Sequence, residues 1–364
     1  MIKKYKVGNG ITAAVDHSTG VVVLSNDNQG LLGGRIKKSR GGALQKYWVE
    51  QTDIKRNDIT KILVRGSKIR LPKDARGLDE NLDFSMFGGL INLQTIDIRG
   101  FDFSNVKDTS WIFCNCRSLK SLDLSSTDTS RVTQMRGMFE GCSGLETINL
   151  HGFNTSNVTN MESMFNCCSA LKTLDINEMD TSKVTDMQGM FNGCTNLTTL
   201  KIDKIDTSSV TNMYCMFNAC ENLAKVHVEN FDTSNVTSLQ CMFRCCYSLV
   251  ALDLGNWDTG NVKFMPAMFE ECRMLRAVNL SGFDTSQVLD MSRMFAMCAS
   301  LANVDMSGFD LSRTNNMSGM FVNCRSLKTI IFKESAPSDT KTTDIFKNCT
   351  PDLNVEITGR KEDG

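Results

Sequence analysis

The sequence predicts an α/β solenoid in which about ten units, each with a short helix and a short strand, stack on one another. A phenylalanine, in most units preceded by methionine, recurs every 26 residues from Phe87 to Phe321. A cysteine follows three positions after most of these phenylalanines, as at Cys168 and Cys246. Inside each unit the apolar spacing changes from that of a helix to that of a strand, which predicts two elements per unit.

The fixed step keeps the phenylalanines in register over most of the chain. They are Phe87, Phe113, Phe139, Phe165, Phe191, Phe217, Phe243, Phe269, Phe295 and Phe321, and Phe346 follows one residue early. A single unit of 26 residues cannot bury its own apolar faces, so each unit is expected to be covered by its neighbours.

The stretch FNTSNVTNMESMFNCCSALKTLDI, residues 153–176, represents one unit. Its first apolar residues have helical spacing and are Met161, Met164, Phe165, Cys168 and Leu171. Thr159 stands three residues before Glu162, which is a capping-box arrangement and predicts the start of that helix. Leu174 and Ile176 then alternate with polar residues, which predicts a strand. The methionine, phenylalanine and cysteine columns are expected in the core.

The flanks divide the chain into three expected regions: a β-rich N-terminal cap over residues 1–80, the solenoid over 81–332, and a partial repeat with a polar tail over 333–364. Within the cap, residues 11–24 predict a β-hairpin around HSTG. Residues 58–72 predict a second strand pair that leads into the first unit. Atypical ends are expected because each must cover one exposed end of the core.

The phrase FDTSNVTSLQCMFRCCYSLVALDL, residues 231–254, resembles the repeat of the BspA-like leucine-rich-repeat surface proteins, also described as mycoplasma-type lipoprotein repeats. Leu171–Ile176 has the L-x-x-L-x-I spacing of the front half of such a repeat. The resemblance covers about residues 82–332. It departs from the usual pattern because Phe153, Met179 and Trp257 are among the residues in the usual Asn/Cys slot.

The resemblance implies a curved parallel sheet on the concave side of the solenoid and short helices on the convex side. It also implies a cell-surface or secreted protein that acts in adhesion or host-protein binding, with no enzymatic activity in the repeats. No signal peptide, lipid-attachment cysteine or anchoring tail is visible in the sequence, so a cytoplasmic protein is the alternative expectation. No apolar run is long enough to predict an integral membrane segment.

The charge of the whole chain does not favour a nucleic-acid or membrane-surface partner, since the formal net charge is −1. Residues 1–80 are nevertheless basic, with 16 Lys and Arg against 8 Asp and Glu, and the rest of the chain is acidic, with 24 against 33. The segment GGRIKKSRGG, residues 33–42, is the densest basic cluster. We favour a solvated loop for it over a site for an anionic partner.

The 15 cysteines predict neither a disulfide framework nor a zinc site, because their short spacings form no paired C-x-x-C ladder and the chain has only three His. They are expected to be buried free thiols. Cys215 and Cys241 are an exception, because they hold the same slot in successive units; whether they are bridged is left open. The recurrent Asp of the D-T-S turns is expected to cap turns rather than to bind calcium.

No catalytic motif is present, so we expect no enzyme, no cofactor and no metal site. The candidate site is the variable slot between the two core residues of each strand. It contains Asp123, Asn149, Asp175, Lys201, His227, Asp253, Asn279 and Asp305. This column is interpreted either as the concave face that binds a protein ligand, such as a host or cell-surface protein, or as a merely solvated sheet. An intracellular scaffold or regulatory protein is the alternative function, and the oligomeric state is not predicted.

Overall fold

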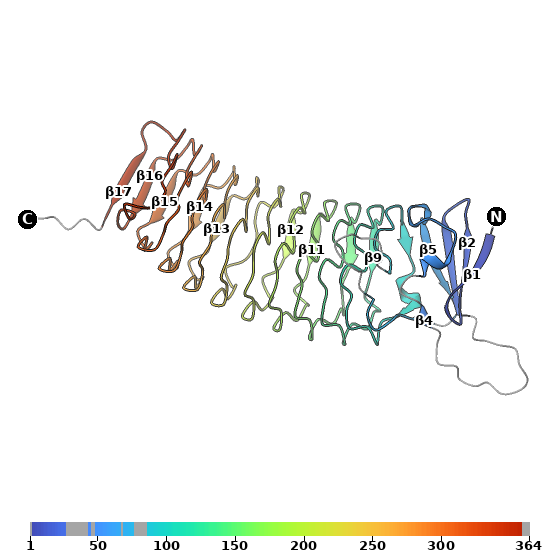
Figure 1. Cartoon of the computed structure of the whole chain (residues 1–364). Coiled ribbons are helices and arrows are strands. Elements are labelled where there is room, and N and C mark those ends of the chain that lie inside the picture. Colours follow the sequence, from blue (N-terminus) through green and yellow to red (C-terminus); the bar gives the residue numbers. More distant parts are fainter. Residues whose placement is uncertain (1, 27–42, 45–47, 67, 76–85, 359–364) are drawn as a thin grey trace, which may run out of the picture. The chain divides into compact units, whose positions relative to one another are not determined.

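The computed structural model describes residues 2–26, 43–44, 48–66, 68–75 and 86–358 (Figure 1). The basic segment 33–42 lies outside the described residues. The chain falls into two compact units. Unit 1 comprises residues 1–171 and 178–180, and unit 2 comprises residues 172–177 and 181–364. Within each unit the chain forms successive coils of 26 residues, whose strands pair in parallel.

Unit 1 begins with an eight-stranded sheet in the order β7-β5-β3-β2-β1-β4-β6-β8. The strands are β1 (Ile2–Asn9), β2 (Ile11–Asp16), β3 (Val21–Asn26), β4 (Ala43–Leu44), β5 (Lys61–Arg65), β6 (Ile69–Arg70), β7 (Thr95–Ile96) and β8 (Phe101–Asp102). Three short 3-10 helices, η1 (Val49–Gln51), η2 (Arg56–Asp58) and η3 (Ile98–Gly100), lie between them in sequence.

The hairpin predicted over residues 11–24 is confirmed, because β2 and β3 pair antiparallel. Its turn needs Gly20, which has φ +71° and where an added Cβ would lie 1.9 Å from the Asp58 carbonyl oxygen. The predicted pairing within residues 58–72 is wrong. Both strands exist, but β5 pairs with β3 and β7, whereas β6 pairs with β4 and β8. Each strand extends a different parallel ladder, so the two do not meet.

The coils continue with short parallel strands, as the sequence predicted. Unit 1 has β9 (Ser121–Asp123) and β10 (Thr147–Asn149), and unit 2 has β11 (Thr173–Asp175), β12 (Thr199–Lys201), β13 (Ala251–Asp253), β14 (Ala277–Asn279), β15 (Asn303–Met306), β16 (Thr329–Phe332) and β17 (Asn354–Ile357). Leu122 pairs with Ile148 and Leu252 with Val278, which is the 26-residue step. Ile330 pairs with Val355, one residue short of that step, as Phe346 indicated.

The predicted short helices are wrong: the described residues contain no α-helix. The N–H groups of Gly137, Phe139 and Gly141 donate to carbonyls of the following coil, at 2.7–2.9 Å, instead of to residues four positions back. Left-handed backbone at Gly137 (φ +54°) and Gly141 (φ +70°) interrupts a helical path. We call this row of inter-coil hydrogen bonds, and its equivalents in the other coils, the turn ladder.

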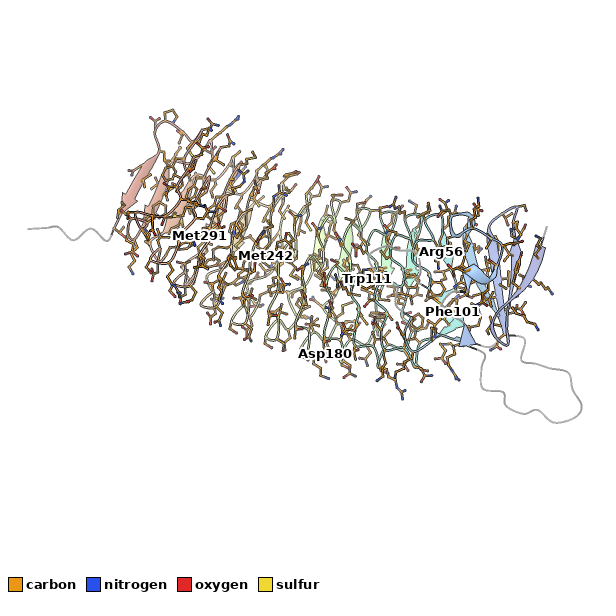
Figure 2. The ribbon with its side chains drawn as sticks, in the orientation of Figure 1. Arg56, Phe101, Trp111, Asp180, Met242 and Met291 are labelled. Atoms are coloured by element: carbon orange, nitrogen blue, oxygen red, sulfur yellow. The ribbon has the colours of Figure 1, made fainter. Side chains whose placement is uncertain are left out.

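Within each unit the turn ladder has one direction, because the N–H groups of a coil donate to carbonyls of the next coil along the chain. The first coil therefore has carbonyls that no earlier coil can satisfy. Side chains from the N-terminal region fill this role: Trp48 Nε1 donates to the Met86 carbonyl at 3.0 Å, and Arg56 Nη1 donates to the Gly88 carbonyl at 2.8 Å. The Arg56 side chain is labelled in Figure 2.

The core consists of stacked columns of identical or similar side chains. Phenylalanine rings of consecutive coils stack with centroids 5.2–5.9 Å apart in both units. Met242 and Met291, labelled in Figure 2, belong to fully buried methionine columns. The apolar spacing thus identified the buried residues correctly, although their backbone is not helical.

The recurrent cysteine has a hydrogen-bonding role in addition to packing. Cys142 Sγ donates to the Phe113 carbonyl at 3.1 Å, and Cys272 Sγ donates to the Phe243 carbonyl at 3.0 Å. Both thiols are fully buried, and burial raises their pKa well above the ordinary value. The slot therefore selects a small side chain that is apolar and still carries a donor.

The turns before the ladder confirm the capping role predicted for Asp. The Asp232 carboxylate accepts the Ser234 N–H at 3.0 Å, an Asx turn. The buried Thr233 hydroxyl donates to the Asp258 carbonyl of the next coil at 2.7 Å. Each D-T-S turn therefore closes on itself through Asp and holds its neighbour through Thr.

In the described part of the chain, no helix has the length and apolarity to cross a membrane.

Candidate functional site

Seven of the eight residues predicted as a site lie on the exposed side of the strands, and His227 holds the equivalent position in a coil whose residues 226–228 form no strand. In β11, for example, Leu174 is buried and Asp175 is exposed, because successive side chains of a strand point to opposite faces. All eight are exposed: Asp123 and Asn149 in unit 1, and Asp175, Lys201, His227, Asp253, Asn279 and Asp305 in unit 2. We call this column, within each unit, the strand face.

Amide and carboxylate side chains of the strand face connect neighbouring coils. Asn149 Nδ2 donates to Asp123 Oδ1 at 3.0 Å in unit 1, and Asn279 Nδ2 donates to Asp253 Oδ1 at 2.7 Å in unit 2. The Ser125 side chain and backbone N–H also hydrogen-bond to Asp123 and lower the pKa of its carboxyl group. Part of the hydrogen-bonding capacity of these carboxylates is therefore used within the protein.

On the strand face, exposed polar side chains at and next to Lys201 contact oppositely charged or hydrogen-bonding neighbours. Lys201 Nζ lies 2.9 Å from Asp175 Oδ2, and this hydrogen bond lowers the pKa of Asp175 and raises that of Lys201. The two side chains are 61% and 51% exposed, so solvent screens the pair and its net contribution to stability is small. His227 Nδ1 contacts Glu229 Oε1 at 2.9 Å. Such weak pairs can open and re-form with charges of a ligand.

On the strand face, no group of side chains is arranged to bind a metal ion or to catalyse a reaction. Over the residues that the structure describes, no three His, Cys, Asp or Glu side chains gather in a way that could hold a metal ion. The acids alternate with amides, Lys201 and His227 rather than converging on one point.

A groove of about 670 Å³ lies on the side of unit 1 that carries the turn ladder, which we call the turn side. The sequence did not predict this groove. Trp111, labelled in Figure 2, lies in its lining, with the Arg136 guanidinium 4.9 Å from the Trp111 ring centroid. Arg136 also pairs with Glu162 at 3.0 Å. Gly137 is needed beneath the indole, because an added Cβ would lie 2.4 Å from Trp111.

A second cluster that the sequence reasoning did not assemble lies on the turn side of unit 2. Cys215 and Cys241, which are free thiols, stand in adjacent coils next to Tyr214 and Arg244. Arg244 Nε in turn lies 2.9 Å from an oxygen of Glu270, a carboxylate that is almost fully buried. The signal in the sequence is the presence of Tyr-Cys and Gln-Cys before two successive Met-Phe pairs, whereas no other unit has Cys at that position.

Three overlapping parts of the chain, residues 83–178, 167–251 and 246–358, match the model of a family described as "Mycoplasma protein of unknown function, DUF285". No curated protein matches the chain.

Solved structures of bacterial repeat proteins are also similar to it. A leucine rich cell surface protein from Faecalibacterium prausnitzii is 18% identical, with 99% of this chain and 96% of that chain covered and a TM-score of 0.38. A leucine-rich repeat protein from Eubacterium ventriosum is 17% identical, with 96% and 95% covered and a TM-score of 0.40. A leucine-rich repeat protein from Bacteroides ovatus is 15% identical, with 96% and 98% covered and a TM-score of 0.36.

Proposed function

Since the chain belongs to the DUF285 family of mycoplasma proteins of unknown function, we propose that it is a non-enzymatic interaction or adhesion module that binds a protein ligand through its strand face. The family match confirms the resemblance to mycoplasma-type repeats, and the parallel coils confirm a solenoid of repeating strands. As part of the proposal, the strand face is the concave side of the solenoid and residues 1–80 form its N-terminal cap.

The observation that carries the proposal is the contrast between buried and exposed positions of the coils. The buried position stays aliphatic, as Leu174, Leu200, Val226 and Leu252. Between them, the strand face changes from Asp175 to Lys201 and back to Asp253. The packing of the repeat does not require this exposed variation, and an extended surface with its own charge pattern is how solenoids select protein ligands.

The expected ligand is a protein with charges complementary to this pattern. An acidic group of the ligand would replace Asp175 as the partner of Lys201, and a basic group would pair with Asp253. A host or cell-surface protein is the class that the repeat family implies. Because the internal pairs are exposed and weak, exchanging them for ligand contacts costs little free energy.

The test places a photo-crosslinking amino acid at His227 on the strand face and, as a matched control, at exposed Lys263 between the strands. Each protein is irradiated with solubilised surface proteins of cultured host cells, and crosslinked partners are identified by mass spectrometry. One partner captured from His227 and not from Lys263 is expected. Equal capture from both positions, or none from His227, would contradict the proposed face.

Charge reversal then tests the assignment with that partner. Lys201→Glu combined with Asp253→Lys is expected to weaken binding at least about tenfold, because two complementary contacts become repulsive at unchanged net charge. Lys263→Glu combined with Asp352→Lys reverses the same charges at exposed positions away from the strand face and should leave the affinity unchanged. Binding is measured by surface plasmon resonance, and equal affinities for both double variants would remove the strand face as the site.

An intracellular scaffold is the second candidate, favoured by the state of the cysteines. All 15 are free and most are buried, which fits a reducing environment. Protease treatment of intact cells, combined with N-terminal sequencing, separates the two candidates. Cleavage on the cell surface supports adhesion, and full protection of an unprocessed chain supports the scaffold.

A further inference from the structure

Cys215 and Cys241 occupy equivalent positions in consecutive coils of unit 2, on the turn side. Both have left-handed backbone, with φ +54° and +56°. The equivalent residues of other coils include Gly137, Gly189 and Gly319, also with positive φ. The fold therefore requires a backbone conformation at this position but no cysteine, so the occurrence of two in succession needs another explanation.

The two residues lie directly beside each other across the turn ladder. The Cys215 N–H donates to the carbonyl of Gln240, the residue before Cys241, at 3.0 Å. Paired parallel backbones are about 4.8 Å apart, and disulfides join Cα atoms roughly 4.4–6.8 Å apart. The two side chains are hydrogen-bonded to each other. The pair can thus be bridged without breaking the register of the coils.

Both thiols are also accessible, unlike those of the core column. Cys215 and Cys241 are partly exposed, whereas Cys220 and Cys246 in the same two coils are buried. The thiols of the buried pair already donate hydrogen bonds, Cys220 to the Phe191 carbonyl and Cys246 to the Phe217 carbonyl. A reagent in solution can therefore reach only the outer pair of this region.

The surroundings of Cys215 favour its thiolate form. The largest contribution comes from the Cys241 thiol, which donates a hydrogen bond to the Cys215 sulfur. The Tyr214 hydroxyl also donates a hydrogen bond to this sulfur, and the positive charge of Arg244 stabilises the thiolate. These groups outweigh burial and lower the pKa of Cys215 to about 7. The same hydrogen bond raises the pKa of Cys241 above the ordinary range. Glu270 faces Arg244 and fixes its orientation through the 2.9 Å contact.

We propose that Cys215 and Cys241 form a reversible dithiol–disulfide pair, in which Cys215 is the attacking sulfur and Cys241 the resolving one. The oxidant is a low-molecular-weight disulfide, RSSR. The Cys215 thiolate attacks one sulfur of RSSR, breaks the S–S bond and expels RS⁻, which leaves a mixed disulfide. Cys241 then loses its proton to solvent and displaces the second RS⁻. In total, the protein loses two electrons and two protons, and RSSR becomes two RSH.

This inference is independent of the proposed ligand face, because the pair lies on the turn side of the coils. The asymmetry of the two sulfurs sets the order of events. Cys215 is a thiolate near neutral pH and reacts first, while Cys241 becomes reactive only when the neighbouring sulfur has been capped and no longer holds its hydrogen bond. An exposed cysteine without such a partner would stop at the mixed disulfide.

The test treats the full folded chain with glutathione disulfide at neutral pH and maps its peptides without reduction. A linked peptide pair containing Cys215 and Cys241 is expected, and reduced glutathione should reverse it. Cys241→Gly should stop at one glutathione on Cys215, and Cys215→Gly should give neither product. Glycine suits the backbone at both positions, since it occupies the equivalent site in other coils. Cys167→Ser, which removes an exposed cysteine of unit 1, is the matched control and should leave the linkage unchanged.

A second measurement follows the order of attack. The rate of alkylation of Cys215 by iodoacetamide should reach half of its maximum near pH 7, whereas Cys167 should need a clearly higher pH because its pKa is raised. Tyr214→Phe should move the Cys215 midpoint upward. The proposal is overturned if both thiols remain free, if the linkage forms only after denaturation, or if Cys241 acquires the first adduct.

Discussion

At the scale of single residues, the cysteine column shows how one side chain meets two requirements. From Cys116 to Cys324 the slot beside each phenylalanine is buried, so a charged group would not fit. A phenylalanine carbonyl of the preceding coil also ends there and can accept a second donor: Phe243 accepts the Cys246 N–H at 3.1 Å and the Cys272 thiol at 3.0 Å. The sequence predicted the burial from the spacing. It could not predict the acceptor, because that carbonyl lies 29 residues away in the chain.

The first prediction concerns Cys272→Val, which keeps the slot apolar and removes the donor. The Phe243 carbonyl would keep the Cys246 N–H, 3.1 Å away, but lose the thiol donor, and the expected loss in the free energy of unfolding is about 0.5–1.5 kcal/mol. Urea denaturation measures it. The exposed Cys167→Ser, which avoids a β-branched side chain at this left-handed position (φ +58°), serves as control and should change the free energy by about 0.5 kcal/mol or less. Equal effects of the two substitutions would show that the thiol of the column contributes only volume.

At the scale of elements, the turn ladder explains why the predicted helices are wrong. Apolar residues at positions i, i+3, i+4 and i+7 face one side in a helix, but the same residues also face inward in these coils. The sequence signal that distinguishes these coils from helices is a pair of glycines four residues apart at left-handed positions, such as Gly137 and Gly141 or Gly189 and Gly193. Glycine at that interval is unfavourable in a helix and favourable where φ must be positive.

The second prediction at this scale concerns the start of the turn ladder. Trp48→Phe and Arg56→Met would leave the carbonyls of Met86 and Gly88 without their donors. We expect amide hydrogen exchange to accelerate first in residues 87–93, with a loss of about 1–3 kcal/mol for the buried indole contact. Arg65→Met, a change at an exposed residue, is the control. Uniform acceleration along the chain would contradict a local capping role.

At the scale of the molecule, the period determined more of the fold than any single motif. A step of 26 residues predicted the pairing of β9 with β10 and of β13 with β14, and the alternation predicted which strand residues are buried. It did not predict how β5 and β6 divide between two ladders, because both strands precede the regular 26-residue repeats. The step also indicated that Cys215 and Cys241 stack, but not that Tyr214 and Arg244 act on Cys215, because a repeat period does not determine side-chain contacts.

The inter-coil hydrogen bonds have a mechanical consequence for a chain pulled at its two ends. They connect each coil to its neighbour, so an end coil can detach while the coils behind it stay bonded. Each detached coil should lengthen the chain by about 90 Å, since one extended residue spans about 3.3–3.6 Å. Optical-trap extension is expected to show repeated steps of about that size. A single large rupture would mean that the coils resist tension together. If the extension occurs in small steps, the protein lengthens gradually under load and does not unfold in one event.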